Sequence, residues 1–177
     1  MSRGFVKEED QEEAPLIPPR AALPAGIDNY VTDEGYAELQ EEKKSLEAQR
    51  HNNPEENETE RRRLNMLIDG KLRLLDERLS SAKLIPLNEQ PSDEVRFGAT
   101  VELRYLNGPM KGKTLKLQIV GVDEANVKKQ KIAFVAPLAK ALMGAKVDEE
   151  RELILGSEQR ALKVLAILYN DGAQSIN

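Results

Sequence analysis

Four carboxylates lie close together within residues 51–60, a short polar stretch of this 177-residue chain that Pro54 interrupts. The carboxylates belong to Glu55, Glu56, Glu58 and Glu60. Charge runs of this kind are usually solvated faces whose glutamates form weak ion pairs, so the residues alone favour a charged turn. His51 is the only histidine and cysteine is absent, which excludes a thiolate nucleophile and a site built from several histidines.

Helical periodicity on both sides predicts that this turn is the tip of a hairpin. Thr32 can cap a first arm over residues 33–49. A second arm over residues 60–83 carries apolar side chains at spacings of three, four and seven, and Pro86 stops it. These apolar residues are Leu64, Leu67, Ile68, Leu72, Leu75, Leu79 and Ala82. Since neither arm can bury its stripe alone, we expect an antiparallel coiled-coil hairpin.

The second half of the chain changes to the alternating pattern of strands, and Pro137 opens a short helix that Gly144 closes. The expected strands are residues 100–106, 115–120, 131–135, 152–155 and 162–169. We therefore predict the α+β class, with the hairpin followed by a small antiparallel-sheet domain that contains one short helix.

The predicted organisation has five segments, and its ends lack apolar periodicity. Within the N-terminal tail, Leu16 and Ile17 could dock on a partner, although a solvated leader is the ordinary interpretation. The segments are a flexible acidic and proline-rich tail (1–30), the hairpin (31–85), a linker (86–94), the sheet domain (95–169) and a frayed tail (170–177).

Composition excludes several classes of function. The net charge of −5 argues against broad binding of nucleic acid, and 4% aromatic residues with no Trp argue against a base-stacking platform. No segment approaches the roughly 20 apolar residues of a spanning helix, and the N-terminus does not resemble a signal peptide. We expect a soluble, cytoplasmic protein without membrane contact, most simply a monomer.

Several motifs, in order, resemble those of the bacterial Gre (GreA/GreB) transcript-cleavage and elongation factors. Residues 31–39 are similar to the family's Thr-x-Glu-Gly-Tyr-x-x-Leu opening, and residues 70–85 are similar to the end of its coiled coil. The sheet domain is similar at residues 97–101, 119–125 and 136–144. The resemblance covers about residues 30–169.

The resemblance implies a hairpin that enters the secondary channel of RNA polymerase and an FKBP-like domain that docks at the channel rim. Glu55, Glu56, Glu58 and Glu60 would act in the polymerase site, where Glu56 and Glu58 would share Mg²⁺ with the polymerase. The chain would have no catalytic residue of its own, would bind no cofactor alone, and would meet DNA and RNA only within the elongation complex. Docking would involve Pro137, Leu138, Leu142, Met143, Asp123 and Glu124, with Leu142 and Met143 partly exposed.

The tip departs from the family's Gly-Asp-x-x-Glu-Asn pattern, and each arm is shorter by roughly one turn or more. If Glu56 and Asn57 match the Glu-Asn pair, Asn53 stands where the family has Asp. Alternatively, Pro54 and Glu55 match a first-arm Arg-Pro-Glu segment, which puts the tip at residues 56–60. Neither alignment reproduces the Asp/Glu pair.

We therefore predict an elongation-factor-like protein that stimulates cleavage of backtracked RNA, or a regulator that occupies the channel without cleaving. A peptidyl-prolyl isomerase is the alternative from another class, and a relative of nucleoside diphosphate kinase regulators is a third possibility. An isomerase needs an aromatic-lined pocket, and the aromatic residues of the sheet domain are Phe97, Tyr105, Phe134 and Tyr169. A lysine cluster could face nucleic acid or an acidic surface, or could discourage edge pairing; it comprises Lys111, Lys113, Lys116, Lys128, Lys129 and Lys131.

Overall fold

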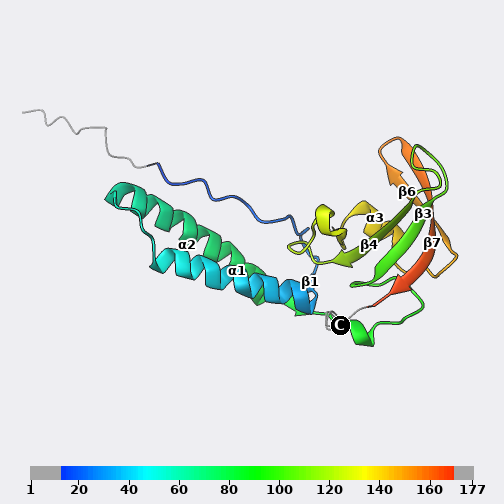
Figure 1. The fold of residues 1–177 in the computed structure, drawn as a ribbon, viewed down its shortest axis with the longest axis horizontal. Helices are drawn as coiled ribbons and strands as arrows, with labels where there is room; N and C mark the ends of the chain where they lie inside the picture. Colours follow the sequence, from blue (N-terminus) through cyan, green and yellow to red (C-terminus); the bar gives the residue numbers. More distant parts are fainter. Residues whose placement is uncertain (1–12, 170–177) are drawn as a thin grey trace, which may run out of the picture.

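The computed structural model describes residues 13–169, in which a pair of long helices projects from a small sheet domain (Figure 1). The helices are α1 (Asp33–His51) and α2 (Glu58–Ser81). Thr32 caps α1, because its hydroxyl accepts a 3.0 Å hydrogen bond from the Gly35 N–H. Asn57 caps α2 by accepting from the N–H groups of Thr59 and Glu60.

Ion pairs between the helices show that they run antiparallel. Lys43 Nζ lies 2.7 Å from Asp76 Oδ1, and Arg50 Nε lies 2.8 Å from Asp69 Oδ1. A forward step along α1 is thus matched by an equal backward step along α2. Between the helices the buried apolar residues are Leu39, Leu46 and Leu75, with Val31 at the base of the pair. The finer description of this helical hairpin as a coiled coil stays a prediction.

Two short strands, β1 (Asn29–Val31) and β2 (Ala82–Leu84), form a parallel pair at the base of the hairpin. The Asn29 amide donates to the Arg78 carbonyl and to the Ser81 hydroxyl, so β1 is tied to the end of α2. The sequence does not predict this pair, because three residues are too few to show a period of two.

The sheet domain contains β3 (Thr100–Tyr105), β4 (Thr114–Val120), β5 (Lys131–Ala133), α3 (Pro137–Leu142), β6 (Glu150–Leu155) and β7 (Glu158–Leu168). The strand order is β5-β4-β3-β7-β6. Alternate side chains of β3, β4 and β7 point inward and form one core with α3. The mixed α+β class predicted from the sequence is therefore correct, whereas the FKBP-like description stays a prediction.

One strand pair differs from the predicted antiparallel sheet, because β5 runs parallel to β4. The chain between them contains the 3₁₀ helix Val127–Lys129 and Gln130 in the left-handed region, at φ 56°. Since β5 pairs with only the last three residues of β4, the chain has to step back only about 7 Å, which a short loop can span. A tight hairpin turn would have given the antiparallel pair.

The N-terminal segment also differs from the expected solvated tail. From residue 13 it runs along the hairpin toward the sheet domain (Figure 1), and Ile17 and Arg20 make specific contacts on the way. The remainder of this predicted tail, residues 1–12, and the predicted C-terminal tail, residues 170–177, lie outside the described residues. Within residues 13–169, neither α1 nor α2 nor any shorter helix is long and apolar enough to cross a membrane.

Candidate functional site

The candidate tip is a six-residue turn, residues 52–57, followed by the first turn of α2. Glu55 lies in the turn and is partly buried, and its carboxylate accepts a 3.0 Å hydrogen bond from the Asn57 N–H. Asn53 also holds the turn by accepting from the Glu55 N–H and donating to Asn65 of α2. The tip residues therefore divide into those that build the turn and those that are exposed on it.

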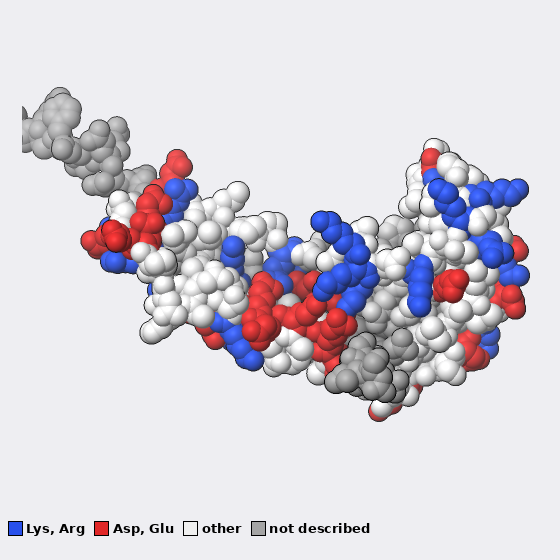
Figure 2. Space-filling model, in the orientation of Figure 1, with Lys and Arg blue, Asp and Glu red and all other residues white. Residues whose placement is uncertain are grey.

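Three glutamates are exposed at this end of the molecule: Glu56 in the turn, and Glu58 and Glu60 in the first turn of α2. Figure 2 shows acidic side chains gathered there. A helix N-terminus favours negative charge, so acidic residues such as Glu58 and Glu60 suit the first turn of α2. Within residues 13–169 no group of three or more His, Cys, Asp and Glu side chains could hold a metal ion. Any cation at Glu56 and Glu58 would thus need further ligands from a partner.

The predicted docking residues in and after α3 fall into two groups. Pro137 is exposed, and Leu138 and Met143 are half-buried. Leu142 has no exposed surface and packs in the core of the sheet domain. The expectation that Leu142 is partly exposed is therefore wrong, because the helix turns that residue toward β6 and the core.

Asp123 and Glu124 were also predicted to dock on a partner, but both side chains are buried within the chain where the hairpin meets the sheet domain. Glu124 accepts a 2.6 Å hydrogen bond from the Thr32 hydroxyl and a 2.9 Å bond from Lys131. Asp123 accepts a 2.8 Å bond from Arg20. Their carboxylates bind other residues of the same chain, so we do not retain Asp123 and Glu124 as docking residues.

Two glycines allow the hairpin and the sheet domain to come this close. A Cβ on Gly35 would lie 2.4 Å from Oε2 of Glu124, and a Cβ on Gly121 would lie 2.6 Å from the carbonyl oxygen of Tyr30. Any side chain at either position would push the two parts of the molecule apart. Gly35 also belongs to the motif on which the family resemblance rests, and the structure gives a physical reason for it.

An aromatic cluster fills the junction beside these polar contacts. Tyr30 of β1 packs against Phe97 and Phe134 of the sheet domain, with ring centroids 5.8 and 5.5 Å apart, and Phe97 and Phe134 meet edge to face at 5.6 Å. Such ring pairs add to the stability gained from apolar burial. Phe97 and Phe134 thus cover each other and Tyr30, which argues against a binding pocket for proline at these rings.

Acidic residues at every fourth position of α1 extend the junction along the helix. Glu34 pairs with Lys131 at 3.0 Å, Glu38 with Lys129 at 3.3 Å, and Glu42 with the guanidinium of Arg20 at 2.8 Å. Residues four apart lie on one face of a helix, so the three glutamates form a single stripe. Figure 2 shows acidic and basic side chains together in this middle part of the molecule.

Only some members of the predicted lysine cluster contact this acidic stripe of α1. Burial alone would lower the pKa of Lys131, but its hydrogen bonds to Glu124 and Glu34 outweigh that effect and raise the pKa above its ordinary value. Lys129 pairs with Glu38, as noted, whereas Lys111, Lys113 and Lys116 are exposed on and beside β4. Lys129 and Lys131 therefore bind the hairpin of the same chain.

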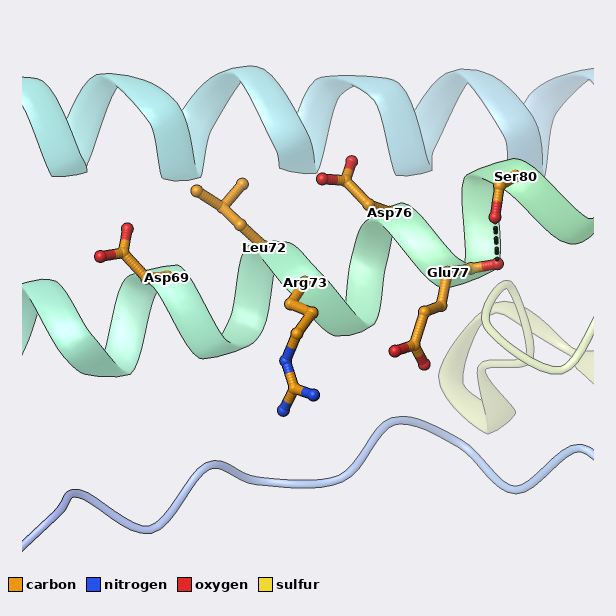
Figure 3. Close-up of a pocket in the computed structure, with 6 residues that line it drawn as sticks. All are labelled: Asp69, Leu72, Arg73, Asp76, Glu77 and Ser80. Carbon is orange, nitrogen blue, oxygen red and sulfur yellow. Dashed lines mark hydrogen bonds between the residues drawn. The ribbon is translucent and has the colours of Figure 1, made fainter.

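An open groove runs along α2 and is lined by Asp69, Leu72, Arg73, Asp76, Glu77 and Ser80 (Figure 3). Its two aspartates already pair with Arg50 and Lys43 of α1. A second, more apolar groove lies beneath the tip and includes Pro54, Leu64 and Ile68. In the first groove the Ser80 hydroxyl donates to the Glu77 backbone carbonyl and not to a base, and no titratable side chain lines the second groove, so neither has the arrangement of a catalytic site.

Sequence reasoning did not identify Arg20, Tyr30 and Arg78 as junction residues. Arg78 Nε lies 3.4 Å from Asp123, and its guanidinium donates to the Ala21 carbonyl. The spacing of Glu34, Glu38 and Glu42 was a usable signal for a basic partner. Nothing in the local sequence indicated that Arg20, 22 residues before Glu42, would be one of those partners.

A two-helix hairpin fixed to a small mixed-sheet domain, with exposed carboxylates at the far end, defines an elongated protein built to present a helical tip. A model of the domain family "Transcription elongation factor, GreA/GreB, C-term" matches residues 90–169. Together with the curated relatives described next, this shows that the chain belongs to the GreA/GreB family of transcription elongation factors.

The chain is 33% identical over 154 residues to transcription elongation factor GreA of Hyphomonas neptunium, a match covering 78% of this chain and 96% of that protein. It is 32% identical over 154 residues to GreA of Neorickettsia sennetsu, covering 78% and 95%. The solved structure of GreA/GreB from Nitrosomonas europaea matches 79% of this chain and 98% of its own, at 18% identity and a TM-score of 0.38. Since 78% of 177 residues is about 138, about 16 of the 154 positions matched to the Hyphomonas protein have no residue here.

Proposed function

We propose that this chain binds RNA polymerase and inserts the tip of its hairpin into the secondary channel, where it stimulates cleavage of backtracked RNA. The observation that carries the proposal is the isolated hairpin tip with Glu56, Glu58 and Glu60 exposed on it. With 24 residues, α2 is about 36 Å long, so the tip lies well away from the sheet domain. Family membership supplies the expected partner.

Glu56 and Glu58 are the residues that we propose to hold a magnesium ion jointly with the polymerase. Their carboxylate oxygens are the ligands that this hard cation prefers, and both are exposed. When bound, the ion would orient water and stabilise charge in the polymerase site. The chain's own part is to carry the two carboxylates into the channel, Glu56 in the turn and Glu58 at the capped start of α2.

A non-cleaving regulator of the secondary channel is the second candidate, and two observations favour it. The motif comparison predicts arms shorter than the family's by roughly one turn or more, and the roughly 16 positions that the Hyphomonas alignment leaves unmatched are enough for such a shortening. The tip also lacks the family's Asp/Glu pair in either alignment, and in one of them Asn53 stands where the pattern has Asp. A tip that stops short of the catalytic metal would restrict the channel without assisting cleavage.

A cleavage assay on backtracked elongation complexes, with polymerase from the same organism, tests the proposal. The chain should shorten the RNA, and Glu56→Ala and Glu58→Ala should each slow that reaction. The control Glu41→Ala, at an exposed position of α1, should leave the rate unchanged. Unchanged rates for both tip variants would disprove the role of the tip. Binding without cleavage, combined with slower nucleotide addition, would establish the non-cleaving regulator, and absence of polymerase binding would reject both candidates.

A further inference from the structure

The N-terminal segment contacts both helices of the hairpin and the sheet domain within six residues, 16–21, which we call the strap. Arg20 Nε donates to Asp123 of the sheet domain at 2.8 Å. Its two terminal nitrogens donate to the two carboxylate oxygens of Glu42 on α1, at 2.8 and 3.0 Å. One guanidinium thus bonds to two carboxylates, one on α1 and one on the sheet domain.

On α2 the strap is held by shape and by the backbone. A Cβ on Gly70 would lie 1.6 Å from Cδ1 of Ile17, so the absence of a side chain at Gly70 makes room for Ile17. The Arg78 guanidinium donates to the carbonyl of Ala21. Figure 3 shows the N-terminal segment running along α2 on the side away from α1, with Arg73 and Glu77 extending toward it.

The strap contacts the hairpin well away from its base. The other junction contacts gather at the base, around Thr32, Glu34 and Glu38. Glu42 lies nine residues into α1, about 14 Å along the helix from Asp33, and Gly70 lies about 16 Å from the end of α2 at Ser81. A contact far from the base restricts the angle between the hairpin and the sheet domain more than an equal contact at the base.

We propose that Arg20 is a positioning residue: through the strap it fixes the direction in which the hairpin leaves the sheet domain. The consequence for transcription rests on the proposed function, because direction decides where the tip arrives once the sheet domain has docked. Arg20 suits this task better than lysine would, because its planar guanidinium binds Glu42 through two nitrogens and Asp123 through the third.

The distance between the hairpin and the sheet domain can be measured on the free protein by pulsed electron spin resonance. The chain has no cysteine, so Ser45→Cys on α1 and Ser157→Cys in the turn between β6 and β7 give two defined spin labels. Arg20→Ala and Glu42→Ala should each broaden the single narrow distance distribution of the parent protein, and Arg20→Lys should broaden it less. Leu16→Ala is the matched control, since that strap side chain is 92% exposed and should leave the distribution unchanged.

Glu42→Ala keeps the test valid if Arg20→Ala disturbs folding, because alanine at an exposed helical position favours the helix. Distributions as narrow as the parent's in both variants would overturn the inference. This measurement needs no polymerase, so it fails or succeeds separately from the proposed function. In the cleavage assay, Glu42→Ala should lower the rate at saturating protein by about threefold or more, with little change in the concentration needed for half of that rate.

Discussion

The hydroxyl of Thr32 forms two hydrogen bonds at once: it accepts from the Gly35 N–H at 3.0 Å and donates to Glu124 of the sheet domain at 2.6 Å. The residue that starts α1 therefore also fastens the hairpin to the sheet domain. Folding of the helix end and docking of the two parts are coupled through one side chain with 2% of its surface exposed.

Replacing Thr32 with Val should lower the free energy of unfolding by about 1–3 kcal/mol, because the helix cap and a buried hydrogen bond are lost together. Urea denaturation followed by circular dichroism measures this change. Thr59→Val is the matched control, since Thr59 is exposed in the first turn of α2, and its effect should be within about 0.5 kcal/mol. Equal losses in the two variants would contradict the coupling described for Thr32.

Replacing Gly35 with Ala should destabilise the protein by about 1–2 kcal/mol, although the same change in an exposed helix stabilises. The reason is the 2.4 Å separation between the new Cβ and Oε2 of Glu124. Comparing melting of Gly35→Ala in the parent and in a Glu124→Ala background isolates that contact. In the second background the loss should become smaller, because only the Cβ of residue 124, 3.2 Å from the new Cβ, remains; a loss of the same size would show that the Glu124 carboxylate is not the cause.

Gly70 and Ile17 should be energetically coupled, because the side chain of one occupies the space that a Cβ on the other would need. Gly70→Ala should gain about 0.5–1 kcal/mol from helix propensity when Ile17 is already Ala, and should lose that gain when Ile17 is present. A double-mutant cycle in urea measures the coupling, which we expect to exceed about 0.5 kcal/mol. Additive effects would mean that the strap does not rest on Gly70 in solution.

Alkaline pH should weaken the junction. The pKa of Lys131 is raised above its ordinary 10.5, because its bonds to Glu124 and Glu34 outweigh burial. A raised pKa in the folded state gives stability that is present below pH 10.5 and is lost as the pH rises through the folded value. Urea midpoints should change in parallel for the parent and Lys131→Met below about pH 9.5, and should fall more steeply for the parent as the pH rises above 10.5. Curves that stay parallel at the higher pH would exclude Lys131 as the source.

The tip glutamates should differ in the cleavage assay according to their hydrogen bonds. Glu56→Gln and Glu58→Gln should lower the rate at least about tenfold, equivalent to about 1.4 kcal/mol, since an amide is a poor ligand for Mg²⁺. Glu55→Gln should change it little, because a glutamine side chain can still accept the bond from the Asn57 N–H. A greater effect for Glu55→Gln than for Glu56→Gln and Glu58→Gln would show that Glu56 and Glu58 are not the metal-binding residues.

Local patterns predicted the elements that have a clear period or a clear cap. The apolar spacing around Leu75 and the cap at Thr32 indicated the helices, which the structure places at Asp33–His51 and Glu58–Ser81, within about two residues of the expected bounds. Alternation around Leu103 and Leu117 indicated β3 and β4 in the same way. Two features without such signals were missed, namely the β1–β2 pair and the parallel direction of β5.

The sequence by itself determined the helical hairpin, the presence of a small sheet domain and the family, because these depend on periodicity and motif order along the chain. It also located the acidic tip, whose action on polymerase stays a prediction. Only the tertiary structure decided the roles of Asp123, Glu124 and Arg20. Arg20 and Asp123 are 103 residues apart, and whether a carboxylate faces a partner protein or a distant arginine of its own chain depends on how the two parts dock. That docking is set by close approach at Gly35 and Gly121 and by packing of Tyr30, which leave no period in the sequence.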